Sequence, residues 1–234
     1  MPVLGFDTAG RTQSVAVAGD GRILAESTIE ALSLHSETLL GTVDLVLRRS
    51  GVALRSLTAI AVACGPGTFT GLRIGMATAK GLAISTGLPL IGESTLVVLA
   101  AALAETGAPR PGTLVCALVS AGRGQVYRGL FRTRLTTVVG EPLIPCSAES
   151  ICDPVDALRG LEKGCIVGGG GVADLPASLL NSLPSESGVV EKSPPLAPIL
   201  ALMIERCERQ GQPGDRVLRP NYVRETDARR PGSP

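Results

Sequence analysis

The chain has 234 residues, 44% of them hydrophobic, and a mean hydropathy of +0.31. It is therefore long enough to bury a core of its own and too apolar to stay disordered. Its 22 basic and 21 acidic residues leave a net charge of +1, so the chain as a whole lacks the basic excess that nucleic-acid-binding proteins usually carry.

The cysteine pattern and the apolar runs indicate where the protein works. None of the six cysteines forms a C-x-x-C pair, so we expect buried reduced thiols instead of a disulfide framework or a zinc site. The opening M-P-V-L-G-F-D-T does not match a signal peptide, and the longest apolar run, residues 96–104, is too short to span a bilayer. We expect a soluble cytoplasmic protein that does not contact the membrane.

Hydrophobic periodicity predicts the elements of the first half of the chain. They are strands at residues 3–7, 14–18 and 22–26, a helix at 36–49, a strand at 57–64, a helix at 70–85, a strand at 88–91 and a helix to about 105. The Gly19-Asp20-Gly21 segment predicts a tight hairpin turn, because D-G readily takes positive φ angles. The continuous apolar run at 57–64 is typical of a buried parallel strand.

The order of elements partly repeats after residue 112. Residues 106–112 contain two prolines and two glycines and read as a linker. Beyond it we predict strands at 114–119, 125–132 and 135–144, a helix at 154–161, a strand at 165–168, a glycine-rich turn, a helical stretch, a strand near 189 and a helix at 198–210. We therefore expect one lobe over residues 1–105, a second over 113–223, and a flexible polar tail at 224–234.

Two β-β-β-α-β-α units in succession resemble the α/β fold of actin, sugar kinases and heat-shock chaperones. The expected fold is accordingly the two-lobe, actin-like and RNase H-like class.

The most informative segment joins a buried strand to a helix and reads G-P-G-T-F-T-G-L-R-I-G over residues 65–75. Gly65 and Gly67 permit tight turns, and Thr68 or Thr70 is suited to cap the helix. Free amides at such a helix start also form a potential anion site. The segment is neither a Walker loop nor G-x-G-x-x-G. A structural turn is favoured over phosphate binding, and both interpretations stay open on physical grounds.

This segment and its continuation, G-x-A-x-A-K-G-L-A, resemble the signature of the TsaB (YeaZ) family. Similar matches are V-L-G-F-D-T at residue 3, H-S-E-T-L-L at residue 35, P-L-I-G at residue 89, and Y-V-R beginning at Tyr222. The resemblance implies a non-catalytic scaffold and activator that needs no cofactor of its own. It implies binding to a TsaD-like catalytic subunit and, through the complex, to a TsaE-like ATPase. That assembly attaches threonylcarbamoyl to the adenosine beside the tRNA anticodon.

The single histidine, His35, bears on the question of a metal site. TsaD-like enzymes are expected to hold a metal with H-x-x-x-H after the P-L-I-G strand, where this chain has Thr95 and Leu99. Leucine cannot ligate a metal and threonine is a poor substitute for imidazole. We therefore expect no metal and no metallopeptidase activity, and a packing or capping role for His35.

An ATP-dependent small-molecule phosphotransferase of the same superfamily is the alternative function. Asp7 ends the first strand, where kinases use an acid for Mg²⁺ and phosphate, although an Asx turn explains it equally simply. The partner acid expected in the second lobe is replaced by Ser120, which counts against this alternative. Weak ATP or ADP contacts are still expected at a set of residues near the glycine-rich turns: Asp7, Gly67, Thr68, Gly169 and Gly170.

The helix at 70–85 is apolar nearly all round, which predicts burial on two faces. One face, Leu72, Met76, Ala79 and Ala83, suits its own sheet. The other is expected to meet either a neighbouring helix of the same lobe or a partner chain, which is the TsaD-like subunit or a second copy of this chain. The predicted partner-contact residues are Leu45, Ile74, Ala77, Thr78 and Gly81. tRNA is expected to bind weakly and mainly indirectly, with Arg224, Arg229 and Arg230 of the tail contributing.

Overall fold

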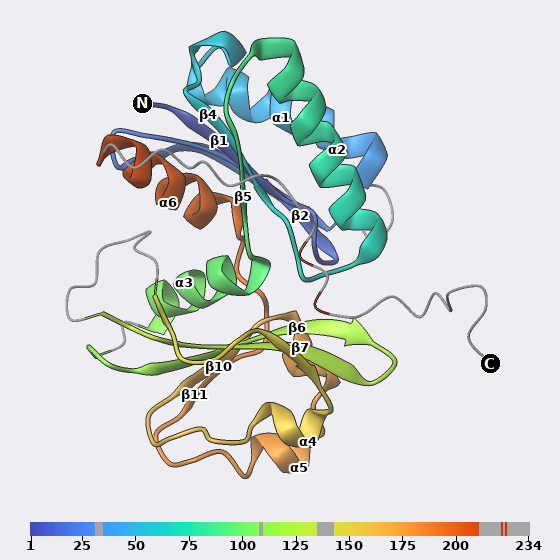
Figure 1. The fold of residues 1–234 in the computed structure, drawn as a ribbon, viewed down its shortest axis with the longest axis vertical. Helices are drawn as coiled ribbons and strands as arrows, with labels where there is room; N and C mark the ends of the chain where they lie inside the picture. Colours follow the sequence, from blue (N-terminus) through green and yellow to red (C-terminus); the bar gives the residue numbers. More distant parts are fainter. Residues whose placement is uncertain (31–34, 108–109, 135–142, 211–220, 222, 224–234) are drawn as a thin grey trace, which may run out of the picture.

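Two β-sheets lie one above the other, with helices between them and on the outer face of each (Figure 1). This computed structural model describes residues 1–30, 35–107, 110–134, 143–210, 221 and 223. Tyr222, Arg224, Arg229 and Arg230 therefore lie outside the described residues, as does most of the strand predicted at 135–144. Among the described residues, no helix combines the length and the apolar character needed to cross a membrane.

The first sheet has the strand order β3-β2-β1-β4-β5. Its elements and their helices are β1 (Val3–Asp7), β2 (Thr12–Gly19), β3 (Arg22–Glu30), α1 (His35–Ser50), β4 (Ala59–Ala63), α2 (Phe69–Thr86) and β5 (Leu90–Glu93), with a short 3₁₀ turn at Leu54–Ser56. β1 pairs antiparallel with β2 and parallel with β4, which pairs parallel with β5. Asp20 and Gly21, at φ angles of 54° and 72°, form the predicted tight turn between β2 and β3.

The second sheet has the order β11-β10-β6-β7-β8, with β9 also paired to β7. Its elements follow α3 (Thr95–Gly107) and are β6 (Leu114–Gly122), β7 (Gln125–Arg132), β8 (Ile144–Pro145), β9 (Ser150–Cys152), α4 (Pro154–Ala157), β10 (Ile166–Gly168), the 3₁₀ segment Gly170–Asp174, α5 (Ala177–Leu180), β11 (Gly188–Val190) and α6 (Ala197–Arg209). β6 pairs antiparallel with β7 and parallel with β10. The two sheets thus repeat one topology.

Alternating side chains of β1 explain why helices cover both faces of the first sheet. Leu4 and Phe6 are buried against α1 and α2, whereas Val3 belongs to the core between the two sheets. At Gly5 a Cβ atom would approach Ala201 Cβ and Ala197 O to 3.0 Å, so its absence lets α6 lie close to the strand. α6 follows the second sheet in the sequence yet packs on β1 and β2 of the first.

The predicted elements differ from the structure mainly in the second half. The helix predicted at 154–161 is the single turn α4, which begins at Pro154, and the short strand β9 was not predicted. In α1, Leu39 is buried, whereas the side chain of the neighbouring Leu40 is 59% exposed. The apolar side of α1 is therefore wider than the part of it that packs against the sheet.

Candidate functional site

The turn after β1 lies directly on the start of helix α2. Gly71 and Gly75, four residues apart, share one side of α2, and Gly67 lies just before the helix begins. A Cβ atom at Gly71 would lie 2.0 Å from Thr8 O, and one at Gly67 would lie 2.5 Å from Ala9 O. Three of the four glycines of the G-P-G-T-F-T-G-L-R-I-G segment, Gly67, Gly71 and Gly75, are thus explained by close approach of the β1–β2 turn.

Hydrogen bonds fix this contact in both directions. Thr8 Oγ1 donates to Gly71 O at 2.7 Å, and the backbone N–H of Thr68 donates to Ala9 O at 2.7 Å. Thr68 occupies the N-cap position of α2, but its side chain makes no capping hydrogen bond. The expected side-chain cap is therefore wrong, because backbone packing of the turn holds the helix start. A ligand contact at Gly67 or Thr68 stays a prediction.

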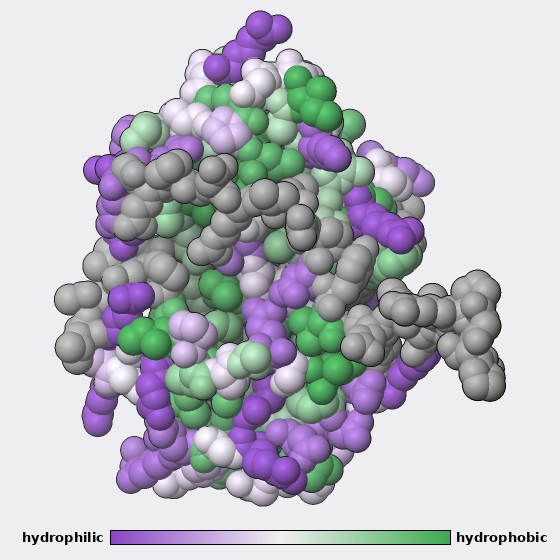
Figure 2. All heavy atoms as spheres, in the orientation of Figure 1, coloured by the Kyte–Doolittle hydropathy of each residue, from purple (hydrophilic) through white to green (hydrophobic). Residues whose placement is uncertain are grey.

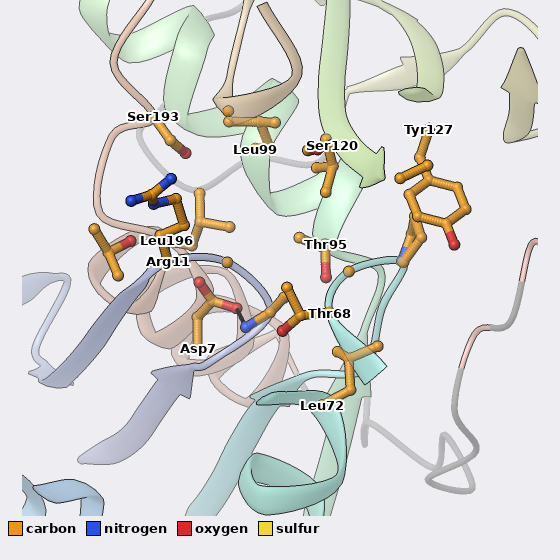
Figure 3. Close-up of a pocket in the computed structure, with 18 of the residues that line it drawn as sticks. Asp7, Arg11, Thr68, Leu72, Thr95, Leu99, Ser120, Tyr127, Ser193 and Leu196 are labelled. Atoms are coloured by element: carbon orange, nitrogen blue, oxygen red, sulfur yellow. Dashed lines mark hydrogen bonds between the residues drawn. The ribbon is translucent and has the colours of Figure 1, made fainter. Parts of the chain in front are cut away.

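A cleft of about 830 Å³ opens beside this turn, between the two sheets (Figure 3). Asp7, Arg11 and Thr68 line it from the first sheet, and Ser120 and Tyr127 line it from the second. The lining also includes Leu99, Leu196, Glu30, Glu191 and Lys192. The walls thus combine apolar side chains with a few hydroxyl and charged groups, as in sites for small molecules.

Asp7 lies at the base of the cleft and is 4% exposed. Its Oδ1 accepts the backbone N–H of Ala9 at 2.9 Å, which is the geometry of an Asx turn. Burial raises the pKa of the Asp7 carboxyl to about 6, and the backbone hydrogen bonds from Ala9 and Thr8 oppose that rise. The carboxyl therefore serves the turn locally, and its charge depends on pH in the physiological range.

The second-sheet residues named from the sequence lie at different places. Ser120 lines the cleft near the end of β6, where the pairing with β7 shifts register before Gly122. Gly170 also lines the cleft, whereas Gly169 is not among its lining residues. Gly169 has a φ angle of 110°, and a Cβ atom there would lie 2.3 Å from Leu118 O. Gly169 is thus required for packing. The nucleotide contact predicted there stays a prediction, and Gly169 does not line the cleft.

The donor set of a TsaD-like metal site does not fit this chain. Thr95 and Leu99, at the positions aligned with the two histidines, both line the cleft, and Leu99 has no donor atom. His35 lies elsewhere, with its Nε2 at 3.2 Å from Gly10 O, so it packs against the β1–β2 turn. Within the part of the chain that the structure describes, no cluster of three His, Cys, Asp or Glu residues could hold a metal ion.

Thr95 is a cleft residue whose role the sequence did not indicate. Its side chain is 2% exposed, and its Oγ1 has no hydrogen-bond partner among the described residues. The helix cap is instead Ser94, whose Oγ accepts the backbone N–H of Leu96 at 3.2 Å. A buried hydroxyl without a partner costs free energy, so a polar group entering the cleft gains a partner at Thr95.

The outer side of α2 presents small and apolar residues beside two exposed basic residues, Arg73 and Lys80. Leu72, Met76 and Ala79 are buried against the first sheet, and Ala77 and Gly81 are exposed. Leu45 on the adjacent helix α1 is 40% exposed, and Ile84, which the sequence interpretation did not single out, is 76% exposed. In Figure 2, hydrophobic surface is visible in the region of α1 and α2 near the top of the view.

A family model described as TsaD, tRNA N6-adenosine threonylcarbamoyltransferase, matches residues 22–162, more than half of the chain. The tRNA threonylcarbamoyladenosine biosynthesis protein TsaB of Haemophilus influenzae is 30% identical over 166 residues, which cover 70% of this chain and 69% of that protein. This chain belongs to the TsaB family.

Escherichia coli TsaB is 40% identical over 128 residues, but the match spans only about half of that relative's length, 53%. A Pseudomonas aeruginosa structure, described as an uncharacterized protein with similarity to peptidase YeaZ, is 25% identical with a TM-score of 0.78. The likeness covers 95% of this chain and 99% of that one. It confirms the predicted two-lobe actin-like fold. The ethanolamine utilization protein EutJ of Carboxydothermus hydrogenoformans, at 13% identity and a TM-score of 0.50, shares the fold alone.

Proposed function

We propose that this chain is the non-catalytic scaffold and activator subunit of a tRNA threonylcarbamoyladenosine-modifying complex. In this proposal it pairs with a TsaD-like catalytic subunit, and a TsaE-like ATPase joins through the complex. The names of the TsaB relatives from Escherichia coli, Bacillus subtilis and Haemophilus influenzae support a role in this biosynthesis. The observation that carries the scaffold role is the exposed side of α2, which presents Ala77 and Gly81.

The residues in the cleft support a non-catalytic role. The position of a metal-ligating histidine is taken by Leu99, and the second-lobe acid is replaced by Ser120. The Leu99 side chain supplies no metal ligand, and Ser120 supplies no carboxylate for Mg²⁺. The transfer reaction and its metal are therefore assigned to the TsaD-like partner.

The exposed side of α2 supports a helix-mediated interface. Gly81 has open space around the position of a Cβ atom, and Ile74 and Thr78 flank it in a half-buried setting. Small residues let a partner helix approach closely, while Leu45 and Ile84 supply exposed apolar area that a monomer does not use. A TsaD-like subunit is the occupant that we propose. A second copy of this chain is the alternative.

Replacing Ala77 by Arg tests this interface. The exposed side chain leaves room in the monomer, whereas burying the unpaired guanidinium in the complex costs several kcal/mol. Since about 1.4 kcal/mol is tenfold in affinity, binding to the TsaD-like subunit should weaken at least about a hundredfold. Size-exclusion elution with and without the partner, together with circular dichroism, measures complex formation and folding separately.

The matched control is Ala177→Arg, the same substitution at an exposed position of α5 below the second sheet (Figure 1). This variant should pair as the wild type does. An Ala77→Arg protein that is folded and still forms the complex would show that α2 is not the contact. The elution volume of the wild type alone reports whether a second copy occupies the same face.

Weak ATP or ADP binding in the cleft is the second candidate function. The unpartnered Thr95 Oγ1 and the cleft volume of about 830 Å³ favour a small polar ligand. Calorimetric titration with ATP and Mg²⁺, followed by a phosphotransfer screen, separates this candidate from a pure scaffold.

A further inference from the structure

Asn221 contacts the turn that follows strand β4 of the first sheet. Its backbone N–H donates to Cys64 O at 2.8 Å, directly beyond the end of β4. Its side-chain Nδ2 lies 3.4 Å from Gly65 O, in the turn that leads into α2. Two residues further on, Val223 packs against the hydrophobic core between the two sheets. Asn221 and Val223 are called the C-terminal strap here.

Glu149 holds the strap from the other sheet. It lies just before β9, and its Oε2 accepts a hydrogen bond from Asn221 Nδ2 at 2.7 Å. The other carboxylate oxygen, Oε1, accepts the hydroxyl of Ser94, the residue that caps α3. Hydrogen bonds to a carboxylate are about twice as strong as bonds between neutral groups. One side chain thus joins the second sheet, the start of α3 and the C-terminal strap.

The turn at Gly65 is shaped to receive the strap. Gly65 has a φ angle of 110°, and a Cβ atom there would lie 2.8 Å from Asn221 O. Its carbonyl oxygen also accepts the backbone N–H of Thr95 at 2.8 Å. Asn221 itself lines the cleft. The strap therefore contacts the cleft wall, the start of α2 and the start of α3 at one place.

We propose that Glu149 is the latch of this strap, because its hydrogen bonds hold the strap against the adjoining cleft wall. When these bonds break, the strap and this wall open together while both sheets stay folded. The contacts that support this proposal connect four segments far apart in the sequence, around residues 65, 94, 149 and 221. By contrast, the hydrophobic cores on the outer faces of the two sheets contain none of these residues. The proposal does not depend on the function proposed above.

Hydrogen–deuterium exchange of the full chain tests the latch. In Glu149→Ala, the amide of Asn221 and those of the first turn of α3 should lose protection by about tenfold or more. Amides of α1 should exchange as in the wild type, because the outer core of the first sheet that holds this helix does not include Val223. Glu149→Gln keeps a carbonyl oxygen that accepts a hydrogen bond, so its loss of protection should be smaller than that of Glu149→Ala.

Two comparisons complete the test. Glu162→Ala removes an exposed ion pair with Arg132 on the second sheet and should leave the strap protected. The double variant Glu149→Ala with Asn221→Ala should lose little more protection in the first turn of α3 than Glu149→Ala alone, because both substitutions break one connection. Unchanged protection at Asn221 in Glu149→Ala, or an equal loss across both sheets, would overturn the proposal.

Discussion

Asp7 shows how one residue type supports two different interpretations. An acid at the end of the first strand suits Mg²⁺ and phosphate in kinases, yet here Oδ1 accepts the N–H of Ala9 within its own turn. Burial also raises the pKa of its carboxyl to about 6, so a permanent negative charge is disfavoured. The sequence identified the residue, but only its surroundings in the fold decide its charge.

The raised pKa of Asp7 predicts a pH-dependent stability difference. The folded value of about 6 exceeds the unfolded value of 3.8, so the folded protein binds the proton more tightly. Ionisation of the carboxyl therefore lowers the free energy of unfolding. This loss is negligible below pH 3.8 and reaches about 3 kcal/mol above pH 6. Asp7→Asn keeps the Oδ1 acceptor and removes the titration. Its stability relative to wild type should rise between pH 4 and pH 6.5 and then level off.

Urea unfolding of both proteins across this pH range measures the difference. A constant offset between Asp7→Asn and wild type would reflect packing alone, so two parallel stability curves would contradict the raised pKa.

Helix α2 is the element that connects the motif to the proposed function. Its start packs by glycines against the β1–β2 turn, its inner side is covered by the first sheet, and its outer side presents Ala77 and Gly81. The sequence correctly predicted that Leu72, Met76 and Ala79 face the sheet. It did not distinguish a structural turn from phosphate binding at Gly65 and Gly67, because both uses require the same absence of a side chain.

Two glycine substitutions in α2 should therefore have opposite effects. Gly71→Ala places a Cβ atom 2.0 Å from Thr8 O, a backbone atom that cannot move away easily, and should destabilise the fold by about 2–3 kcal/mol. Gly81→Ala meets no atom within 4 Å and should stabilise the helix by up to about 1 kcal/mol. Thermal or urea unfolding compares them. Equal effects of the two substitutions would refute the packing explanation of the motif.

At the scale of the whole molecule, the near balance of 22 basic and 21 acidic residues predicts weak direct tRNA binding. Few phosphates can be neutralised by such a surface. The tail is more basic, with Arg224, Arg229 and Arg230 beyond the strap. Because Val223 packs against the core between the sheets, a tail deletion should begin after it.

A chain that ends at Val223 should bind tRNA more weakly than the full chain. Each lost phosphate contact reduces the slope of log affinity against log salt by about 0.7–0.9, so the loss of three arginines should lower the slope by about 2–3. Gel-shift titrations at several salt concentrations measure both quantities. Tight, salt-insensitive binding by the shortened chain would place the tRNA contact elsewhere.

The sequence by itself determined the order of strands and helices in the first half, the tight turn at Asp20-Gly21 and the buried side of α2. These follow from periodicity and turn chemistry, which act over a few residues. The family followed from the G-P-G-T-F-T-G segment. Only the tertiary structure decided that α6 packs on the first sheet, that Asp7 is buried, and that Glu149 meets Ser94 and Asn221. The physical reason is that such contacts join residues 55 or more positions apart in the sequence, and no local pattern of side chains encodes which of them meet.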